Sequence, residues 1–298
     1  MKRSIGERIG QYLIVALLLV LCLSIIYPFL YMLAISLNVG SDAAKGGVYL
    51  WPREFTLYNY EIVLGNSVIQ RAYVITIFRT IIGTVVGLVV TLLVAFGLSY
   101  RQLPIRKVLL TYVLITMLFN GGLIPLYIQL NNLSLLNSFW VYIIPSAFSA
   151  WNMFVMMKFI QGIPDALVES AEMDGANPLR VLYSIILPLS KPMLAALGLF
   201  TAVFHWNDWF AGAFYVSNQN IIPVQTFLQQ LLSAQDISTV LGSNNNQEAL
   251  ARGTMGSNIT LLSIKMATVM VSALPILFVY PFLQKYFVKG VLIGSVKG

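Results

Sequence analysis

The chain has 298 residues, of which 58% are hydrophobic and 10% are charged, and its mean hydropathy is +0.80. An ordinary soluble domain carries about 25% charged residues, so this composition excludes one and predicts an all-α integral membrane protein. The net charge of +7 does not indicate nucleic-acid binding, because the basic residues occupy short segments between apolar runs. The single cysteine, Cys22, allows neither an internal disulfide nor a cysteine metal site.

The first apolar run follows three basic residues and has to be distinguished from a signal peptide. It is longer than the apolar core of a signal peptide, and no cleavage site of the A-x-A type follows it, so we expect a retained first span. Windows of about 19 residues predict further spans along the chain. The predicted fold is one transmembrane domain, 1–298, with six helices at 12–37, 73–99, 108–130, 139–160, 190–216 and 261–284.

The basic residues between the spans predict the orientation of the chain. They precede the first span, join the second to the third, and follow the sixth, where they are Lys285, Lys289 and Lys297. Because loops that stay inside the cell carry the excess of Lys and Arg, we expect both termini and the segment between the fourth and fifth spans to be cytoplasmic. The segments 38–72, 131–138 and 217–260 are then external.

The last external segment contains a predicted amphipathic helix, too short to span a bilayer. It begins after Pro223, which is compatible with a first helical turn, and its apolar residues recur at i, i+3, i+4, i+7 and i+8. Two placements are open for this helix: the outer rim of the helix bundle, or contact with a partner. The residues are Val224, Phe227, Leu228, Leu231 and Leu232.

The polar segment 164–188 predicts two helices joined by a sharp turn. Asp165 places a negative charge in the first turn of a helix, where the helix dipole favours it. Gly175 can adopt the left-handed conformation that ends this helix. Asn177 followed by Pro178 is an N-cap and a first helical residue, so a second helix begins at once. We call this segment the elbow.

The elbow resembles the EAA loop of importer-type ABC permeases. That pattern runs Glu-Ala-Ala, three residues, Gly, nine residues and Ile-x-Leu-Pro; here it begins at Glu169, reaches Gly175, and ends at Pro188, with Ser170 in place of the first Ala. The surrounding residues look most like the carbohydrate permeases of the maltose type. The segments 119–125 and 294–298 resemble a branch of that group that imports complex oligosaccharides.

The resemblance implies a type I importer permease fold in which the elbow is a cytoplasmic coupling helix. The contact with an ATPase subunit would involve Glu169, Ser170, Ala171, Met173, Asp174 and Gly175, with Leu167 as a further apolar anchor. The alternative is an elbow that only joins two spans. The C-terminal tail, with Ser295 and Lys297, is similar to one that reaches between the ATPase subunits, and the alternative is a frayed terminus.

The resemblance also implies the partners: a sister permease that makes a heterodimer, two ATPase subunits, an external solute-binding protein and an oligosaccharide. The expected location is the bacterial cytoplasmic membrane, which the chain crosses several times. No G-x-x-x-x-G-K-[ST] segment occurs in the sequence, so we expect ATP and Mg²⁺ to be bound by partner subunits. No catalytic or metal-ligating constellation is recognisable, which indicates a non-enzymatic subunit without its own cofactor.

Polar residues within the predicted spans are candidates for a substrate path, because such residues face a bundle interior or a wet cavity. Amide and carboxylate groups bind sugar hydroxyls, and a tryptophan face covers an apolar sugar face. The alternative is that His205 and Asp208, at i and i+3, only brace one another or a partner subunit. The candidates are Asn120, Asn152, His205, Trp206, Asn207, Asp208 and Trp209.

Two basic residues, Arg79 and Lys265, lie in the outer third of predicted spans. They either reach toward the outer headgroups or form a positive lining that favours an acidic oligosaccharide such as a uronate. In the third span, Gly121 and Gly122 with Pro125 have two open readings: a break of the helix, as at transport sites, or a tight contact between helices.

Two other classes of protein remain open. An ion-coupled secondary transporter needs buried carboxylates, and Asp208 is the only acidic residue in the predicted spans. A membrane sensor or scaffold needs no elbow for an ATPase. The motif therefore favours the permease.

Overall fold

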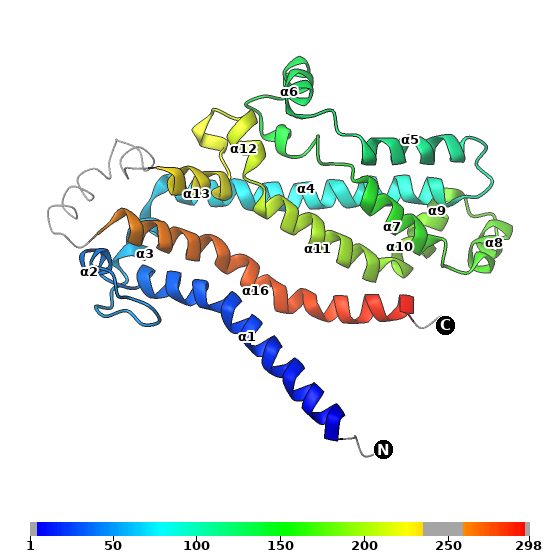
Figure 1. Ribbon diagram of the computed structural model, residues 1–298. Helices are drawn as coiled ribbons and strands as arrows, with labels where there is room; N and C mark the ends of the chain where they lie inside the picture. Colours follow the sequence, from blue (N-terminus) through cyan, green and yellow to red (C-terminus); the bar gives the residue numbers. More distant parts are fainter. Residues whose placement is uncertain (1–4, 235–258, 296–298) are drawn as a thin grey trace. The chain divides into compact units, whose positions relative to one another are not determined.

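The computed structural model describes residues 5–234 and 259–295, and its regular elements over these residues are helices (Figure 1). The chain divides into two compact units. The first unit contains residues 1–70 and 227–274, and the second contains residues 71–226 and 275–298. The all-α prediction is confirmed, while the single transmembrane domain stays a prediction.

Three helices are long and apolar enough to cross a membrane: α1 (Ile5–Ser36), α4 (Ser67–Ser99) and α16 (Leu261–Ser295). Two bent pairs meet the same criteria when each is taken as one span. The pair of α5 (Arg106–Leu118) and α6 (Leu123–Asn132) is bent by 116°, and Pro178–Leu189 is bent by 78° against α11 (Lys191–Asn207). The described residues therefore provide three to five spans by length and composition.

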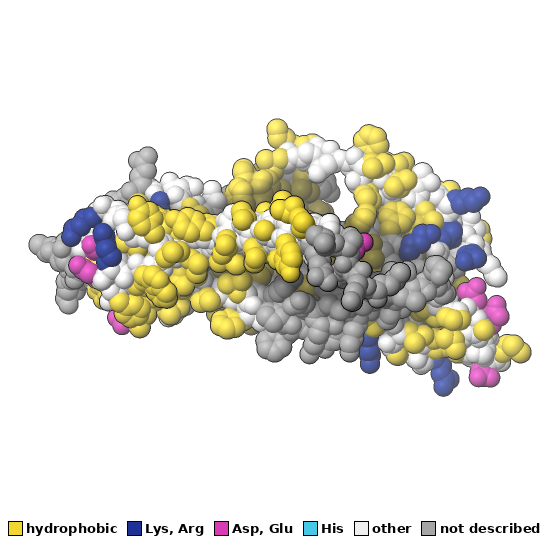
Figure 2. All heavy atoms as spheres, turned by 60° about the horizontal axis from the view of Figure 1, so that its bottom comes forward, with side chains coloured by type: hydrophobic (Ala, Val, Ile, Leu, Met, Phe, Trp, Pro, Cys, Tyr) yellow, Lys and Arg dark blue, Asp and Glu magenta, His cyan; other side chains and the backbone are white. Residues whose placement is uncertain are grey.

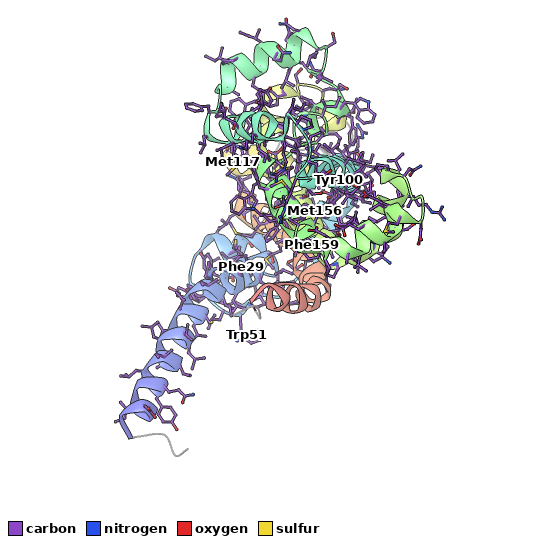
Figure 3. All side chains as sticks on the ribbon, turned by 90° about the vertical axis from the view of Figure 1, so that its right-hand side faces the viewer. Phe29, Trp51, Tyr100, Met117, Met156 and Phe159 are labelled. Atoms are coloured by element: carbon purple, nitrogen blue, oxygen red, sulfur yellow. The ribbon has the colours of Figure 1, made fainter. Side chains whose placement is uncertain are left out.

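In the first unit, α1 exposes apolar side chains on all sides over most of its length (Figure 3). A helix that is hydrophobic all round is typical of a membrane span. Only its last turns are buried, where Ala34 and Ile35 pack with Ala43 of α2 (Gly40–Ala44) and with Met266 of α16. This packing fixes the end of α1 against its own unit.

A network of side-chain hydrogen bonds joins the end of α1 to the loop before α3 (Tyr58–Gly65). The side-chain amide of Asn38 donates to the Asp42 carboxylate at 3.0 Å, and Arg53 Nε donates to the same oxygen at 2.9 Å. The hydrogen bond from Asn38 and the neighbouring Arg53 lower the pKa of Asp42. These hydrogen bonds pair the buried carboxylate of Asp42 and hold the loop before α3 against the end of α1.

The core of the second unit is built where α4 meets α7 (Ala150–Ile160) and α11. Met153 and Met156 of α7 are completely buried in it, and Figure 3 shows Met156 within the packed helices. Val181 and Leu182 of the elbow are also buried in this core. The elbow is thus tied directly to the helices that would span the membrane.

The predicted helix at 139–160 is wrong as a continuous element. A short 3-10 helix, η1 (Phe139–Tyr142), is followed by non-helical residues 143–149, and α7 begins only at Ala150. Pro145 lacks an N–H group and disfavours helical geometry in the residue before it. Ser149 then caps α7, because its hydroxyl oxygen accepts from the N–H of Asn152 at 3.3 Å.

The predicted helix at 190–216 is also interrupted. Helix α11 ends at Asn207, Asp208 is extended, and α12 (Phe210–Tyr215) follows. Asp208 causes the interruption, because one carboxylate oxygen accepts from the N–H groups of Phe210 and Ala211 at 2.9 and 3.3 Å and so caps α12.

The predicted break of the third span lies where the structure separates α5 from α6. Gly122 has a φ of +87°, and its N–H donates to the side chain of Asn120 at 2.9 Å. The amphipathic helix after Pro223 is confirmed as α13 (Val224–Ser233), with Val224, Phe227 and Leu231 buried.

Candidate functional site

The elbow folds as its local sequence predicts. Helix α8 (Asp165–Met173) ends in a Schellman turn, in which the N–H of Gly175 donates to Glu172 and that of Ala176 donates to Ala171, at 3.0 and 2.9 Å. Gly175 has a φ of +80°, the left-handed conformation that glycine adopts most easily. The chain therefore reverses within a few residues at Gly175.

The second helix of the elbow starts immediately after the turn. The side-chain oxygen of Asn177 accepts from the N–H of Arg180 at 2.8 Å and caps α9 (Pro178–Val181). A π-helical segment, η2 (Leu182–Ile186), follows instead of a regular α-helix, and α10 (Leu187–Leu189) completes the elbow. Pro188 cannot donate to the carbonyl four residues earlier, which accounts for the wider turn before it.

One side of α8 is free for contact with another protein. Met173 is 89% exposed, and Leu167 is also exposed. Ala171, in contrast, packs against the core of its own unit, so its small side chain serves the attachment of α8. The hydroxyl of Ser170 donates to the carbonyl of Leu167 at 3.2 Å, so the departure from Glu-Ala-Ala adds no unpaired polar group.

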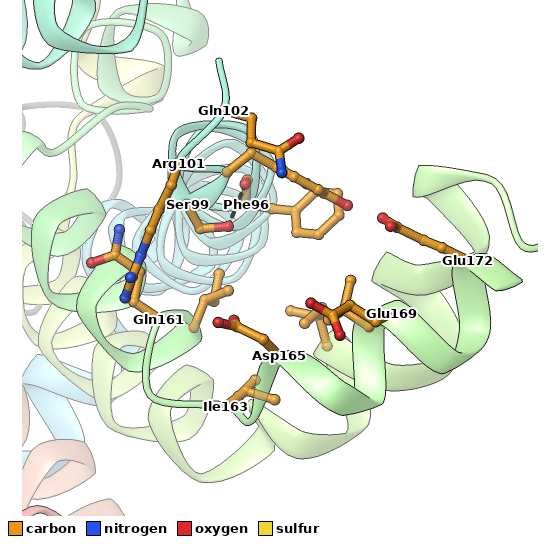
Figure 4. A pocket seen from close by; sticks show the side chains of 13 residues that line it. Phe96, Ser99, Arg101, Gln102, Gln161, Ile163, Asp165, Glu169 and Glu172 are labelled. Carbon is orange, nitrogen blue, oxygen red and sulfur yellow. Dashed lines mark hydrogen bonds between the residues drawn. The ribbon is translucent and has the colours of Figure 1, made fainter.

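A cavity of about 270 Å³ lies behind α8, between it and the end of α4 (Figure 4). The carboxylates of Asp165, Glu169 and Glu172 line it from α8, and Arg101 and Gln102 line it from the segment after α4. Glu169 therefore faces this cavity, on the side of α8 next to the end of α4.

The end of α4 is a part of the elbow site that the sequence motif did not reveal. Burial raises the pKa of Tyr100, and the charge of Glu172 raises it further. Arg101 lines the cavity that the α8 carboxylates face. The sequence signal for this contact is the basic segment after the second span, which by itself predicts only the orientation of the chain. Charged side chains gather at this end of the unit (Figure 2, right).

The structure does not bring the predicted substrate-path residues into one cavity. Asn152 lines a cavity with Thr201, to which its side-chain amide donates at 3.3 Å. Asn120 is an exposed residue of the α5–α6 break, and Trp206 packs with Tyr73 at a ring distance of 6.4 Å. The exposed ring of Trp209 contacts Phe210 and Phe214, and Asn207 is exposed at the end of α11.

Asp208 pairs with Arg79 of α4, and the suggested brace between His205 and Asp208 is wrong. The Arg79 guanidinium donates to the side-chain carboxylate of Asp208. It also donates to the backbone carbonyl oxygen of Asp208 at 2.8 Å. Arg79 is 1% exposed and lies over the ring of Tyr142, 4.6 Å from its centre. The charge of Arg79 is therefore paired with that of Asp208 inside the second unit. The side chain neither reaches toward the lipid headgroups nor lines a substrate path.

Lys265 has a structural role as well. Its ammonium group donates to the carbonyl oxygens of Leu232 and Ala234, both at 2.8 Å, and so caps the end of α13. With Arg79 paired and Lys265 capping a helix, neither alternative, contact with the outer headgroups or a positive lining, describes these two residues. Neither side chain therefore indicates an acidic substrate.

His205 is completely buried and packs directly against Gly83 of α4. A Cβ atom at position 83 would overlap the imidazole ring, so glycine is required here for close approach of the two helices. His205 is therefore part of a helix contact.

We expect Gly83→Ala to lower the melting temperature of the purified importer, because overpacking costs about 1–3 kcal/mol. Gly97→Ala is the control, since its added Cβ atom meets no neighbour within 4 Å. The double variant Gly83→Ala with His205→Ala should regain part of the lost stability. Equal melting temperatures for the Gly83 and Gly97 variants would contradict the close contact.

Similarity to known proteins identifies the family of the chain. Residues 83–293 match the family of the binding-protein-dependent transport system inner membrane component. The chain belongs to this family. It is therefore a multi-pass inner-membrane protein and a permease subunit of a binding-protein-dependent ABC importer, and it has no catalytic activity of its own. The elbow and the long apolar helices are the features expected of such a subunit.

Two relatives from Bacillus subtilis (strain 168) cover nearly the whole chain. The polygalacturonan/rhamnogalacturonan transport system permease protein YtcP is 37% identical, over 98% of this chain and 99% of the relative. The protein LplC is 38% identical, over 92% of this chain and 90% of the relative.

A solved structure shows the same fold over almost all of the chain. It is a bacterial ABC transporter involved in the import of the acidic polysaccharide alginate. The TM-score is 0.88 at 29% sequence identity, and the match covers 96% of this chain and 99% of the other. The membrane-permease fold is thereby confirmed.

Proposed function

We propose that this permease imports oligosaccharides by coupling its elbow to a separate ATPase subunit. The observation that carries the proposal is the geometry of α8: a short helix tied to the core through Ala171, ended by Gly175, and exposing Met173 almost completely. An exposed apolar anchor beside a rigid turn is suited to a pocket of a partner protein.

The importer carries oligosaccharides. YtcP is named for polygalacturonan and rhamnogalacturonan, and the solved transporter for alginate, all of which are polysaccharides rich in uronates. Oligosaccharides of galacturonate are accordingly the first substrates to test. The chain's own paired Arg79 and capping Lys265 do not argue for or against an acidic substrate.

The proposed assembly contains this chain, a sister permease, two ATPase subunits and an external solute-binding protein. Both termini and the elbow face the cytoplasm, and the chain crosses the membrane six times if the broken segments at 108–130, 139–160 and 190–216 each make one passage. ATP and Mg²⁺ bind to the ATPase subunits, and this chain holds no cofactor. The proposed tail contact uses Ser295, the last residue of α16, and Lys297, which lies outside the described residues.

The test is reconstitution of the importer in proteoliposomes after the native partners have been purified with the tagged chain. We expect ATP hydrolysis and uptake of trigalacturonate only when the ATPase subunits and the loaded binding protein are both present. ATP hydrolysis by the isolated, contaminant-free chain would contradict the proposal that separate ATPase subunits hydrolyse the ATP.

A variant of the elbow tests the coupling contact itself. Met173→Glu should reduce ATPase-driven uptake severely, because it places a charge on the exposed apolar side chain that the proposed contact would bury. Met173→Leu is the matched control and should retain uptake. Normal uptake with Met173→Glu would contradict the proposed contact.

A further inference from the structure

The loop between α2 and α3, residues 45–57, exposes large apolar side chains; we call it the α2–α3 loop. Trp51 is 83% exposed and projects from the edge of its unit (Figure 3). Val48, in contrast, packs into the small core at the end of α1. An exposed group of large apolar side chains marks contact with a protein or with a membrane. The others in this loop are Tyr49, Leu50, Phe55 and Leu57.

Hydrogen bonds to the end of α1 hold the α2–α3 loop in one conformation. The N–H of Val39 donates to the carbonyl of Glu54 at 2.9 Å, and the N–H of Thr56 donates to the carbonyl of Leu37 at 2.8 Å. Arg53 adds three hydrogen bonds, to α2 and to the start of the loop. The loop therefore presents its exposed side chains from a fixed backbone.

The length of α1 places the α2–α3 loop at the boundary between lipid and water. The apolar span Ile9–Ser36 has 28 residues and is therefore about 42 Å long. At the usual tilt of about 20° it still covers about 39 Å, compared with about 30 Å for the hydrocarbon core and about 40–45 Å for the whole bilayer. The antiparallel bridge between Asn38 and Phe55 keeps the loop level with the end of this helix. The loop is thus at the depth of the lipid headgroups.

The residue types of the loop suit this depth. Trp and Tyr are enriched at membrane–water interfaces, because their rings are apolar while their N–H or O–H groups can bond to headgroups. Arg53 is paired with Asp42, and the other charged residues of the loop, Lys45 and Glu54, are exposed, so headgroup water can solvate them. Apolar rings next to solvated charges are typical of a segment that lies in the interface.

The surroundings of the loop favour lipid as its partner. Along most of α1, apolar side chains are exposed on all sides, and the rings of Tyr27 and Tyr31 stack at 6.5 Å in the half of the helix next to the loop. The exposed side chains of the loop therefore continue a surface made for lipid. At this depth, a side chain that projects sideways meets phospholipid unless another chain covers it.

We infer that the α2–α3 loop inserts its rings into the headgroup layer of the outer leaflet and anchors the external end of α1 there. The partner is the phospholipid bilayer, contacted mainly through Trp51. The inference goes beyond the proposed import and requires only the proposed orientation, in which the loop is external. Because Arg53 and Asp42 fix the loop to the end of α1, the anchor sets the depth at which this helix crosses the membrane.

Fluorescence quenching tests the anchor in the assembled importer, reconstituted in nanodiscs of phosphatidylethanolamine and phosphatidylglycerol. Cys22→Ala removes the only thiol of this chain, and this importer treated with the dye gives the background from the partner subunits. An NBD label at Leu50→Cys should be quenched by a phospholipid spin-labelled near its headgroup at least about threefold more than the same label at Gln219→Cys. Gln219 is the matched control, because it is also exposed and lies in a polar external segment, η3 (Gln219–Ile221). A spin label deep in the acyl chain should quench the Leu50 label less than the headgroup label does.

A change of the main ring tests its part in the anchor. Trp51→Glu, added to the Leu50→Cys chain, should lower the quenching by headgroup-labelled lipid at least about twofold, because a carboxylate is unfavourable next to hydrocarbon. Trp51→Tyr is the matched control and should keep the quenching, since tyrosine also suits the interface. Equal quenching in the Trp51→Glu and Trp51→Tyr chains would overturn the role of Trp51.

The other outcomes separate the possible partners of the loop. A Leu50 label that aqueous iodide quenches and lipid does not, or that the deep spin label quenches more, overturns the anchor. Weak quenching by lipid, with shielding from iodide only after the loaded binding protein is added, would assign the loop to that protein. Shielding from both quenchers before that addition would assign it to the sister permease. If an impermeant thiol reagent reaches Gln219→Cys only from the cytoplasmic side of sealed vesicles, the proposed orientation is wrong and the outer leaflet with it, while the proposed import of oligosaccharides stands.

Discussion

The Gly175→Val permease is expected to insert and fold but to lose transport almost completely. Gly175 has a φ of +80°, and a Cβ atom built there meets no neighbour within 4 Å, so the cost comes from the backbone and not from crowding. Left-handed geometry costs an L-residue about 1–2 kcal/mol, and a β-branched side chain is especially unfavourable there. Relief of this strain would open the Schellman turn and change the direction of α8 relative to α9.

The measurement is sugar uptake and ATP hydrolysis by the reconstituted importer, with membrane insertion checked by the amount of folded protein. Gly175→Asn is the matched control, because asparagine tolerates the left-handed conformation and should retain most of the uptake. Full transport by Gly175→Val would show that the shape of this turn is not needed for coupling.

The elbow was predictable because its signals are short-range. Asp165 at the start of α8, Gly175 after its end, and Asn177 before Pro178 each act on a neighbouring turn of backbone, and the structure places all three as expected. The inward direction of Glu169 was not predictable in the same way. It depends on the position of the end of α4, more than sixty residues earlier in the chain.

The breaks of the apolar runs were predicted unevenly. Windows of hydrophobicity measure composition and not hydrogen bonding, so 139–160 scored as one span although Pro145 and its neighbouring serines favour an interruption. At Gly121 and Gly122 the sequence leaves a break and a tight helix contact open, and the φ of +87° at Gly122 decides for the break. The same windows place Asp208 inside a span, whereas its carboxylate accepts from the backbone N–H groups of Phe210 and Ala211 and so caps α12.

The partner of Asp208 could not be predicted from the sequence. Arg79 lies 129 residues earlier, and no periodicity links the two positions. Of the residues expected to form a substrate path, Asn152 lines a cavity with Thr201, while His205 packs against Gly83 and Asp208 pairs with Arg79. Composition and residue spacing therefore do not predict which buried charges pair when the two residues lie far apart in the chain.

Asp208→Ala is expected to prevent stable assembly of the importer. Arg79 is 1% exposed, and removal of its partner leaves an uncompensated buried charge, which costs about 3–5 kcal/mol. Asp208→Asn separates the two roles of this residue, because the amide oxygen can still cap α12 but no longer balances Arg79. Both single variants should give a lower melting temperature and less intact complex on a native gel, with Asp208→Ala the more severe.

The double variant of Arg79→Met with Asp208→Asn is the decisive comparison. It removes both charges and keeps the cap, so it should recover much of the stability that either single change loses, as a coupled pair requires. An Asp208→Ala importer that assembles normally and loses only sugar uptake would instead identify Asp208 as a substrate contact. Recovery of stability by the double variant, together with preserved sugar uptake, would show that neither charge is needed for substrate recognition and that the Arg79–Asp208 pair holds α12 in place.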